Sequence, residues 1–163
     1  MYWIEKPGPG RLAIAARPRA GDWLADEIAA WRVDGVDQVV SLLEPHEVHD
    51  LDLKSEADAC ALAGIDFRSF PIVDRGVPES KVRTLALVEA CKEMLAADRG
   101  VLIHCRAGIG RSALIAACVL VSMGDAPDAA FSRIAVARGV EVPDTTVQRD
   151  WVDAFVALAA PLD

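Results

Sequence analysis

The sequence predicts a single three-layer α/β domain over residues 1–163, with a mixed, mostly parallel central sheet flanked by helices. Short aliphatic runs alternate with helix-length segments along the chain. Hydrophobic residues make up 53% of the 163 residues, and no stretch is of low complexity, so one compact core is expected. The run Val101–Ile103 leads through a short glycine-containing loop into the apolar segment Ser112–Met123. This strand–loop–helix unit is predicted to organise the domain.

The N-terminal part of the chain predicts a hairpin, a helix and a central strand. Tyr2–Glu5 and Arg11–Ala16 flank a turn rich in proline and glycine, which is typical of two adjacent strands. In Asp22–Trp31, apolar residues recur on one helical face, with Asp22 as a candidate N-cap and both tryptophans expected in the core. The aliphatic run Val36–Leu43 predicts a buried central strand.

The middle of the chain predicts a short helix, a strand and a long helix. Ser55–Ala63 is expected to be helical and to end at Gly64. Ile65–Phe70 alternates between apolar and polar residues, as a strand does. Residues 80–97 have the pattern of an amphipathic helix, on which Val82 is placed among the inward-facing residues.

Three further helices are predicted after the central loop. Ser112–Met123 is almost entirely apolar but too short to cross a bilayer, so this helix and its Cys118 are expected in the core. Ala126–Ala137 is predicted to be a helix closed by Gly139, and Thr145–Leu158 a final helix.

Charge and cysteine content exclude several functions and suggest a compartment. The net charge of −8 argues against a nucleic-acid or anionic membrane partner. The four cysteines lack the spacing of a metal site or a disulfide framework, and His46 and His49 have no further ligands beside them. Neither a metal nor another cofactor is therefore expected. The first residues lack a signal-peptide layout, and a reactive thiolate needs reducing conditions, so the cytoplasm is predicted.

The central loop has the features of an anion site. Its glycines permit a tight turn, and its peptide N–H groups would converge at the start of the following helix, where unpaired donors favour an anion. The expected phosphate-binding residues are those between the cysteine and the helix, namely Arg106, Ala107, Gly108, Ile109, Gly110 and Arg111.

Four side chains in and beside this loop predict nucleophilic attack on phosphorus. Cys105 lies at a helix N-terminus, which favours its thiolate. Arg111 offers a planar fork of donors that suits two phosphate oxygens. Ser112 is placed to donate to the sulfur when it leaves, and His104 is expected to orient the loop.

The segment HCRAGIGRS resembles the His-Cys-x5-Arg-Ser signature of the cysteine-dependent protein tyrosine and dual-specificity phosphatases. The segment Pro71–Pro78 is similar to the Pro-Ile-x-Asp-x-x-x-Pro loop of the small, kinase-associated type. The resemblance implies a phosphatase fold and a monomer without cofactors. It also implies hydrolysis of phosphotyrosine, and beyond it phosphoserine and phosphothreonine, in phosphorylated proteins through a cysteinyl-phosphate intermediate.

The resemblance also assigns roles to two residues outside the loop. The family has a catalytic acid on a loop before the cysteine, and Asp74 is the only acidic residue in the segment 70–78. The stretch Thr145–Trp151 resembles the Gln-Thr-x-x-Gln segment near the end of family domains, in which the first glutamine helps to place water. Asp144 stands at that position here, which leaves Gln148 either as a supporting residue or as a helix-surface amide.

Several alternatives remain open at this level. Glu44 is expected to be an exposed carboxylate. In the alternative interpretation, Glu44 approaches the phosphate loop and holds Arg111. Arg106 resembles a basic residue of inositol-phosphate and phosphoinositide phosphatases, although Ile109 stands where those enzymes usually carry lysine. A rhodanese-like sulfurtransferase typically has a cysteine loop one residue shorter. A non-catalytic phosphate-binding module would have lost Cys105, Arg111 or Asp74.

Overall fold

The sheet is mixed and mostly parallel, as predicted. The computed structural model describes residues 1–159, so the last four residues of the predicted domain, 160–163, lie outside the described part. One five-stranded sheet has the order β1-β2-β5-β3-β4, in which only β1 runs antiparallel to its neighbour. Its strands are β1 (Tyr2–Ile4), β2 (Arg11–Ala16), β3 (Gln38–Ser41), β4 (Asp66–Ser69) and β5 (Gly100–Cys105).

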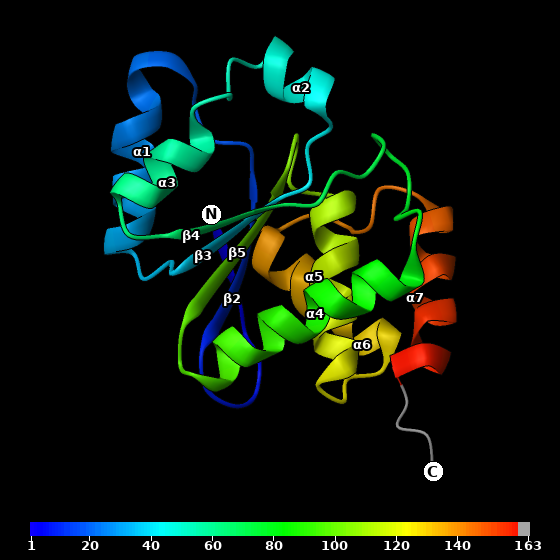
Figure 1. The fold of residues 1–163 in the computed structure, drawn as a ribbon. Helices are drawn as coiled ribbons and strands as arrows, with labels where there is room; N and C mark the ends of the chain where they lie inside the picture. The colour runs from blue at the N-terminus through cyan, green and yellow to red at the C-terminus, as the bar shows by residue number, and fades with distance from the viewer. Residues whose placement is uncertain (160–163) are drawn as a thin grey trace.

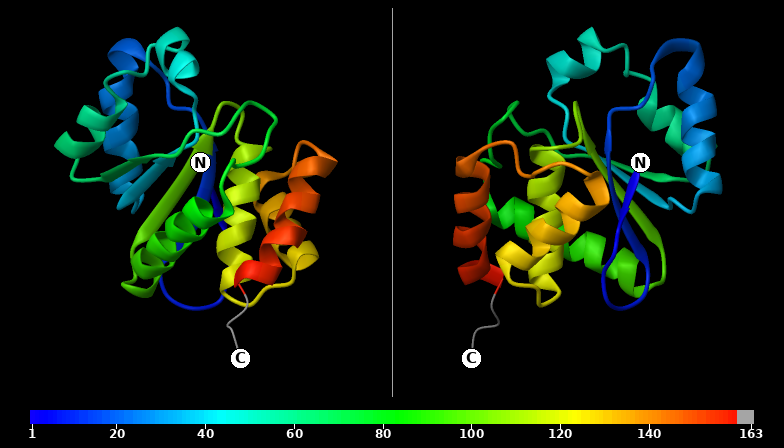
Figure 2. Two further views of the ribbon diagram at one scale, coloured as in Figure 1. Left: turned by 45° about the vertical axis from the view of Figure 1, so that its right-hand side comes forward. Right: turned by 180° about the vertical axis from the view of Figure 1, so that it is seen from behind.

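Helices cover both faces of this sheet and complete the three layers (Figure 1). The pair α1 and α3 lies on one face, and α4 to α7 lie on the other (Figure 2). The helices are α1 (Leu24–Val33, after a 3-10 turn at Gly21–Trp23), α2 (Pro45–Asp50), α3 (Glu56–Leu62), α4 (Lys81–Ala96), α5 (Arg111–Ser122), α6 (Pro127–Arg138) and α7 (Thr146–Ala159).

The alternation of side chains along β2 and β5 divides the core in two. Leu12, Ile14 and Ile103 pack among the residues of α4 to α7, whereas Ala13 and Leu102 pack against the α1–α3 side. The apolar helix α5 is buried from its first residue almost to its last, as predicted, and it contacts α4, α6, α7 and the sheet. Within residues 1–159, no helix is both long enough and apolar enough to span a membrane.

Three details of the sequence analysis were wrong. Asp22 caps no helix: it lies within the 3-10 turn that precedes α1, and neither this turn nor α1 has a side-chain cap hydrogen bond at its N-terminus. Trp23 belongs to that turn and is 59% exposed, whereas Trp31 on α1 is buried. Val82 is 77% exposed, because the buried stripe of α4 begins at Thr84 and recurs every three or four residues from there.

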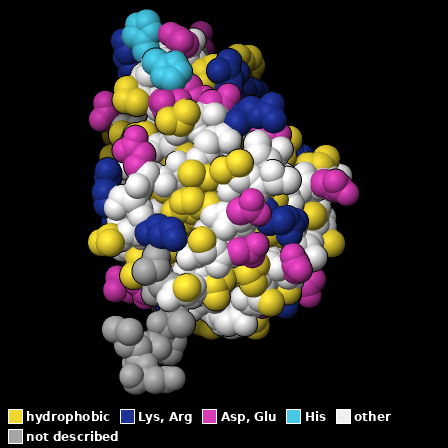
Figure 3. All heavy atoms as spheres, turned by 90° about the vertical axis from the view of Figure 1, so that its right-hand side faces the viewer, with side chains coloured by type: hydrophobic (Ala, Val, Ile, Leu, Met, Phe, Trp, Pro, Cys, Tyr) yellow, Lys and Arg dark blue, Asp and Glu magenta, His cyan; other side chains and the backbone are white. Residues whose placement is uncertain are grey.

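The surface carries charges of both signs. On the face shown in Figure 3, Asp and Glu side chains are interspersed with Lys and Arg. His46 and His49 are exposed on α2, as expected for a solvated helix face. In the part of the chain that the structure describes, no three His, Cys, Asp or Glu side chains are grouped as they would be in a metal site.

Candidate active site

The loop 106–110 connects the carboxyl end of β5 to the N-terminus of α5. Because β5 lies between β2 and β3, this loop emerges from the middle of the sheet at its carboxyl edge. Gly108 has φ +69°, and a Cβ on it would lie 2.5 Å from the backbone of Ala15 and Ala16. Only glycine fits both the conformation and the contact, which holds the loop tightly against the end of β2.

The Cys105 sulfur lies at the base of this loop. The Gly108 N–H donates to Cys105 Sγ at 3.3 Å, and Ser112 Oγ lies 3.4 Å from the same sulfur. Cys105 is 3% exposed and borders a cavity of about 190 Å³. The cavity is lined by Asp74, Arg75, Cys105, Arg106, Ala107, Ile109, Gly110, Arg111, Asp144 and Gln148.

A buried carboxylate, Glu47, holds the Arg111 guanidinium. Arg111 Nη1 and Nη2 lie 2.6 and 2.9 Å from the two Glu47 oxygens, and both side chains are almost completely buried. Nη1 also donates to the Ile72 carbonyl at 3.0 Å. This bidentate pair sets the plane of the guanidinium before any substrate arrives.

Glu47, and not Glu44 as the alternative prediction had it, is the carboxylate partner of Arg111. Glu44 is the N-cap of α2, and its carboxylate accepts the Asp74 N–H at 3.2 Å. Glu47 accepts the Glu44 N–H at 3.0 Å, completing a capping box. The glutamates at the N-cap and N3 positions of this short helix were the sequence signal that could have predicted the inward position of Glu47.

The pair shifts the pKa of both its members. Burial alone would raise the pKa of Glu47, but the hydrogen bonds from Arg111 and from the Glu44 N–H outweigh it and leave this pKa below its ordinary value. Burial alone would lower the pKa of Arg111, but Glu47, followed by Cys105 and Asp74, raises it. Glu47 and Arg111 are therefore both charged at neutral pH.

We expect Glu47→Gln to lower the free energy of unfolding at pH 7 by about 3 kcal/mol, because it leaves a buried guanidinium without its main partner. The folded-state pKa of Glu47 lies below its unfolded value, so its contribution is complete above the unfolded pKa and is lost as pH falls through the folded pKa. The difference between wild type and variant should therefore shrink below about pH 4.

Urea unfolding of both proteins across this pH range measures the effect. Glu93→Gln, on the exposed side of α4, is the matched control and should match wild type. Equal stability of Glu47→Gln and wild type at pH 7 would contradict the prediction.

The segment carrying Asp74 is attached to the site at several points. Asp74 Oδ1 lies 3.0 Å from Arg111 Nη2, and its carboxylate is 56% exposed. Arg75, with φ +57°, forms an ion pair with Asp144 at 3.3 Å. The Gly76 carbonyl accepts the Gln148 side-chain N–H at 3.0 Å. These contacts keep Asp74 beside the loop although Cys105 lies 31 positions further along the sequence.

Gln148 is a buried residue of the site, so its alternative as a helix-surface amide is wrong. Its side chain is fully buried, and a Cβ on Gly110 would lie 3.0 Å from its carboxamide atoms. Asp144 packs against the same glycine. The first turn of α7 therefore covers the end of the loop, which the pattern of α7 alone did not indicate.

His104 lies behind the loop and is fully buried. Its Nε2 is 2.7 Å from Glu56 Oε1 at the start of α3, and its ring centroid is 6.2 Å from that of Trp31. Glu56 was not among the predicted site residues, because its only signal in the sequence is its place in the first turn of a short helix. The remaining loop positions divide by exposure: Arg106 and Ala107 are exposed, Ile109 is half-buried, and Gly108 and Gly110 are buried.

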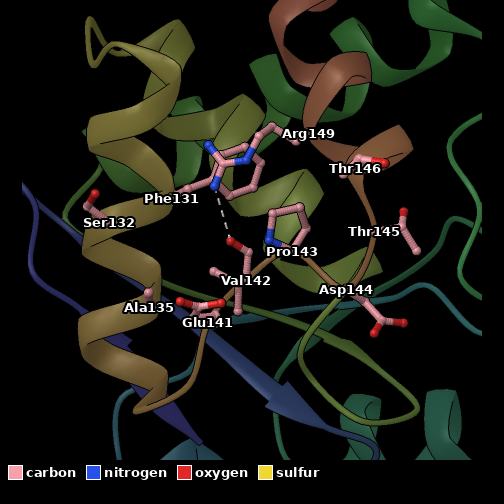
Figure 4. Close-up of a pocket in the computed structure, with 10 residues that line it drawn as sticks. All are labelled: Phe131, Ser132, Ala135, Glu141, Val142, Pro143, Asp144, Thr145, Thr146 and Arg149. Atoms are coloured by element: carbon pink, nitrogen blue, oxygen red, sulfur yellow. Dashed lines mark hydrogen bonds between the residues drawn. The ribbon is translucent and has the colours of Figure 1, made fainter.

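A second hollow of about 390 Å³ lies between α6 and the start of α7 (Figure 4). It shares Asp144 with the site but does not reach Cys105. Arg149 lines this hollow. Its guanidinium carbon lies 4.7 Å from the centroid of the Phe131 ring, and its Nη1 pairs with Asp128 Oδ1 at 2.8 Å. Arg149 is therefore part of the wall of this hollow and is already engaged by an acid.

The mixed sheet, the loop after β5 and the cysteine–arginine pair define a cysteine-dependent phosphatase domain of the dual-specificity and protein tyrosine class. The chain belongs to the family described as "Polymorphic toxin system, DSP-PTPase phosphatase", whose model matches residues 13–125. The family resemblance predicted from HCRAGIGRS is thus confirmed.

Known proteins agree with this assignment. Human cyclin-dependent kinase inhibitor 3 is 33% identical over 94 residues, which cover 56% of this chain and 44% of that protein. The chain therefore spans less than half the length of the curated relatives it matches. Kinase-associated phosphatase with its catalytic cysteine changed to serine superposes with a TM-score of 0.86 at 23% identity, over 99% of this chain and 96% of that one. Tk-PTP in its active form superposes with a TM-score of 0.76 at 26% identity, over 91% of this chain and 92% of that one.

Proposed function

We propose that this chain hydrolyses phosphomonoesters in phosphorylated proteins, with phosphotyrosine as a substrate and phosphoserine and phosphothreonine as further ones. One observation carries the proposal. A cysteine sulfur lies under a backbone N–H and beside a serine hydroxyl, in the same cavity as a guanidinium held by a buried carboxylate. This arrangement combines a nucleophile with preorganised donors for a tetrahedral oxyanion.

In the first step, Cys105 attacks phosphorus while the loop N–H groups and Arg111 hold the phosphoryl oxygens. The contacts to Glu47, Ile72 and Asp74 engage the terminal nitrogens of Arg111. A phosphoryl oxygen would therefore bind at Nε, and at Nη2 in place of Asp74. Phosphate binding displaces Asp74 from that contact, and in the protonated enzyme form Asp74 donates its proton to the leaving oxygen as the P–O bond breaks.

In the second step, water attacks the cysteinyl phosphate. The P–O bond forms as the S–P bond breaks, and the electron pair stays on Cys105 sulfur. Ser112, 3.4 Å away, donates its hydroxyl to that sulfur and stabilises it as a leaving group. Asp74, now ionised, accepts the proton of the water. Gln148 supports this step by holding the Asp74 segment through Gly76.

A phosphoprotein is the proposed substrate class because a sequence relative is named for a protein kinase that it inhibits, and a structural neighbour is a kinase-associated phosphatase. We propose that the chain acts as a monomer in the cytoplasm, where reducing conditions preserve the nucleophile.

Two other cysteines are less reactive than a free thiol. Burial raises the pKa of Cys60 to about 12, with a further contribution from Glu56, and burial raises the pKa of Cys91 to about 12. These two buried thiols are thus poor nucleophiles at neutral pH.

Hydrolysis of para-nitrophenyl phosphate, with and without vanadate, tests the activity. A panel of phosphotyrosine, phosphoserine, phosphothreonine and inositol-phosphate substrates then tests the class. Faster turnover of inositol phosphates than of every phosphopeptide would favour the alternative substrate class. Sulfur transfer from thiosulfate to cyanide without phosphate release would favour a sulfurtransferase. Vanadate binding without any turnover would favour a binding module.

We expect Asp74→Asn to lower kcat by about 10²- to 10³-fold for a phosphopeptide, because the leaving oxygen loses its proton donor. The loss should be smaller for an aryl ester whose leaving group is a weaker base. Asp66→Asn, on the exposed side of β4, is the control. Equal losses for good and poor leaving groups would argue against the acid role.

A further inference from the structure

Arg138 contacts the outer side of the phosphate-binding loop. Its Nε donates to the Gly108 carbonyl at 3.0 Å, and its Nη2 lies 3.4 Å from the Ala107 carbonyl. The residue is half-buried at the end of α6, and its guanidinium lies 4.4 Å from the centroid of the Tyr2 ring on β1. The helix α6 packs on both β1 and α5 (Figure 2). Arg138 thus connects the end of α6 to β1 and to the loop. Neither Tyr2 nor Arg138 lies within the family match at residues 13–125.

The planarity of the peptide bond links this outer contact to the inner surface of the loop. The Ala107 carbonyl and the Gly108 N–H belong to one trans peptide, so they point in opposite directions. That carbonyl contacts Arg138, and that N–H donates to Cys105 Sγ. In the same way, the Gly108 carbonyl that Arg138 binds belongs to the peptide of the Ile109 N–H. Holding the two carbonyls outward therefore holds the two N–H groups inward.

The loop needs such a restraint at this point. Gly108 has a positive φ and no side chain, so the peptides on either side of it rotate more freely than others. Two backbone contacts also restrain the loop: the Arg17 N–H donates to the Arg106 carbonyl at 3.4 Å, and the Gly108 backbone packs against Ala15 and Ala16, but neither engages the Ala107 and Gly108 carbonyls. Arg138 supplies a charged donor for the Ala107 and Gly108 carbonyls. Its position at the C-terminus of α6 suits a cation.

We propose that Arg138 is a positioning residue for oxyanion binding, and that Tyr2 in turn holds Arg138. The role rests on the proposed function, because it assumes that the loop binds a phosphoryl group. Arg138 does not touch the reacting atoms. It acts by keeping the 107–108 and 108–109 peptides in the orientation that presents their N–H groups to the anion.

The test compares Arg138→Met and Arg138→Lys with Arg133→Met. Arg133 lies on the same helix but pairs with Asp125 at 2.9 Å and donates to the Glu5 carbonyl, away from the loop. Vanadate binding by calorimetry reports on the loop directly, and kcat and KM for para-nitrophenyl phosphate report on turnover. Thermal unfolding of each variant shows that the folded protein is being measured.

Deleting one oxyanion donor costs about 10²- to 10³-fold in kcat, so loss of alignment should cost less, about 10- to 50-fold in both vanadate affinity and kcat/KM for Arg138→Met. Arg138→Lys should fall between Arg138→Met and wild type, because a lysine supplies charge without the fork. Arg133→Met should bind vanadate as wild type does. Tyr2→Ala should lose more vanadate affinity than Tyr2→Phe, because phenylalanine keeps the aromatic ring against which the Arg138 guanidinium lies.

Wild-type vanadate affinity in both Arg138 variants would overturn the proposal, whatever their thermal stability. Lower stability with unchanged affinity would assign Arg138 a purely structural role and would overturn it as well. If wild type binds vanadate but hydrolyses no phosphomonoester, the proposed function fails, while the affinities still decide the role of Arg138.

Discussion

Cys105→Ser is expected to lower kcat for para-nitrophenyl phosphate by more than about 10⁴-fold, the largest loss predicted for this protein. Serine keeps the size and position of the side chain, but its hydroxyl remains protonated at neutral pH, so the nucleophile is lost. The donors in the site remain, since the Gly108 N–H, Ser112 and Arg111 are unchanged. The variant should therefore still bind a phosphorylated substrate.

Turnover and binding must be measured separately to test this. Steady-state hydrolysis measures the loss of chemistry, and calorimetry with a phosphopeptide measures retained binding. Cys118→Ala is the matched control, because Cys118 lies on α5, buried in the core, and should keep activity. Wild-type turnover by Cys105→Ser would exclude the covalent mechanism. Loss of binding together with turnover would instead indicate that the loop had collapsed.

Arg111→Lys is expected to lower kcat/KM by about 10³-fold, although the positive charge is kept. The arginine contacts both Glu47 oxygens, the Ile72 carbonyl and Asp74 at once. One ammonium group cannot meet the Glu47 pair and also present a planar face to two phosphoryl oxygens. Because Glu47 stays buried, the lysine is expected to remain with this carboxylate, away from the substrate.

The same variant separates charge from geometry. We expect weaker vanadate binding and a lower kcat, together with a loss of stability smaller than that of Glu47→Gln, since an ion pair survives. Arg83→Lys, on the exposed side of α4, makes the same chemical change and should leave kcat/KM unaltered. If kcat/KM of Arg111→Lys fell by less than tenfold, a point charge without the guanidinium fork would be sufficient for phosphoryl binding and turnover.

Much of the fold could be predicted because its signals are local. The aliphatic runs at β3 and β5 and the apolar helix α5 were placed to within about two residues. Two of the three failures, at Trp23 and Val82, concern the side of an element that faces the core. A shift of one or two residues rotates a helical side chain from inside to outside, and weakly amphipathic segments do not specify that rotation.

The loop that carries the site was determined by the sequence itself. Cys105, Gly108, Arg111 and Ser112 lie within eight consecutive residues between a strand and a helix, so the chain connection alone brings them together. The tertiary structure alone decided which distant groups support them. Glu47 rather than Glu44 faces Arg111, Glu56 approaches His104, and Arg138 reaches the outer carbonyls. These partners are 30 to 64 residues from the loop groups they contact, and their directions depend on how whole helices pack, which local spacing does not encode.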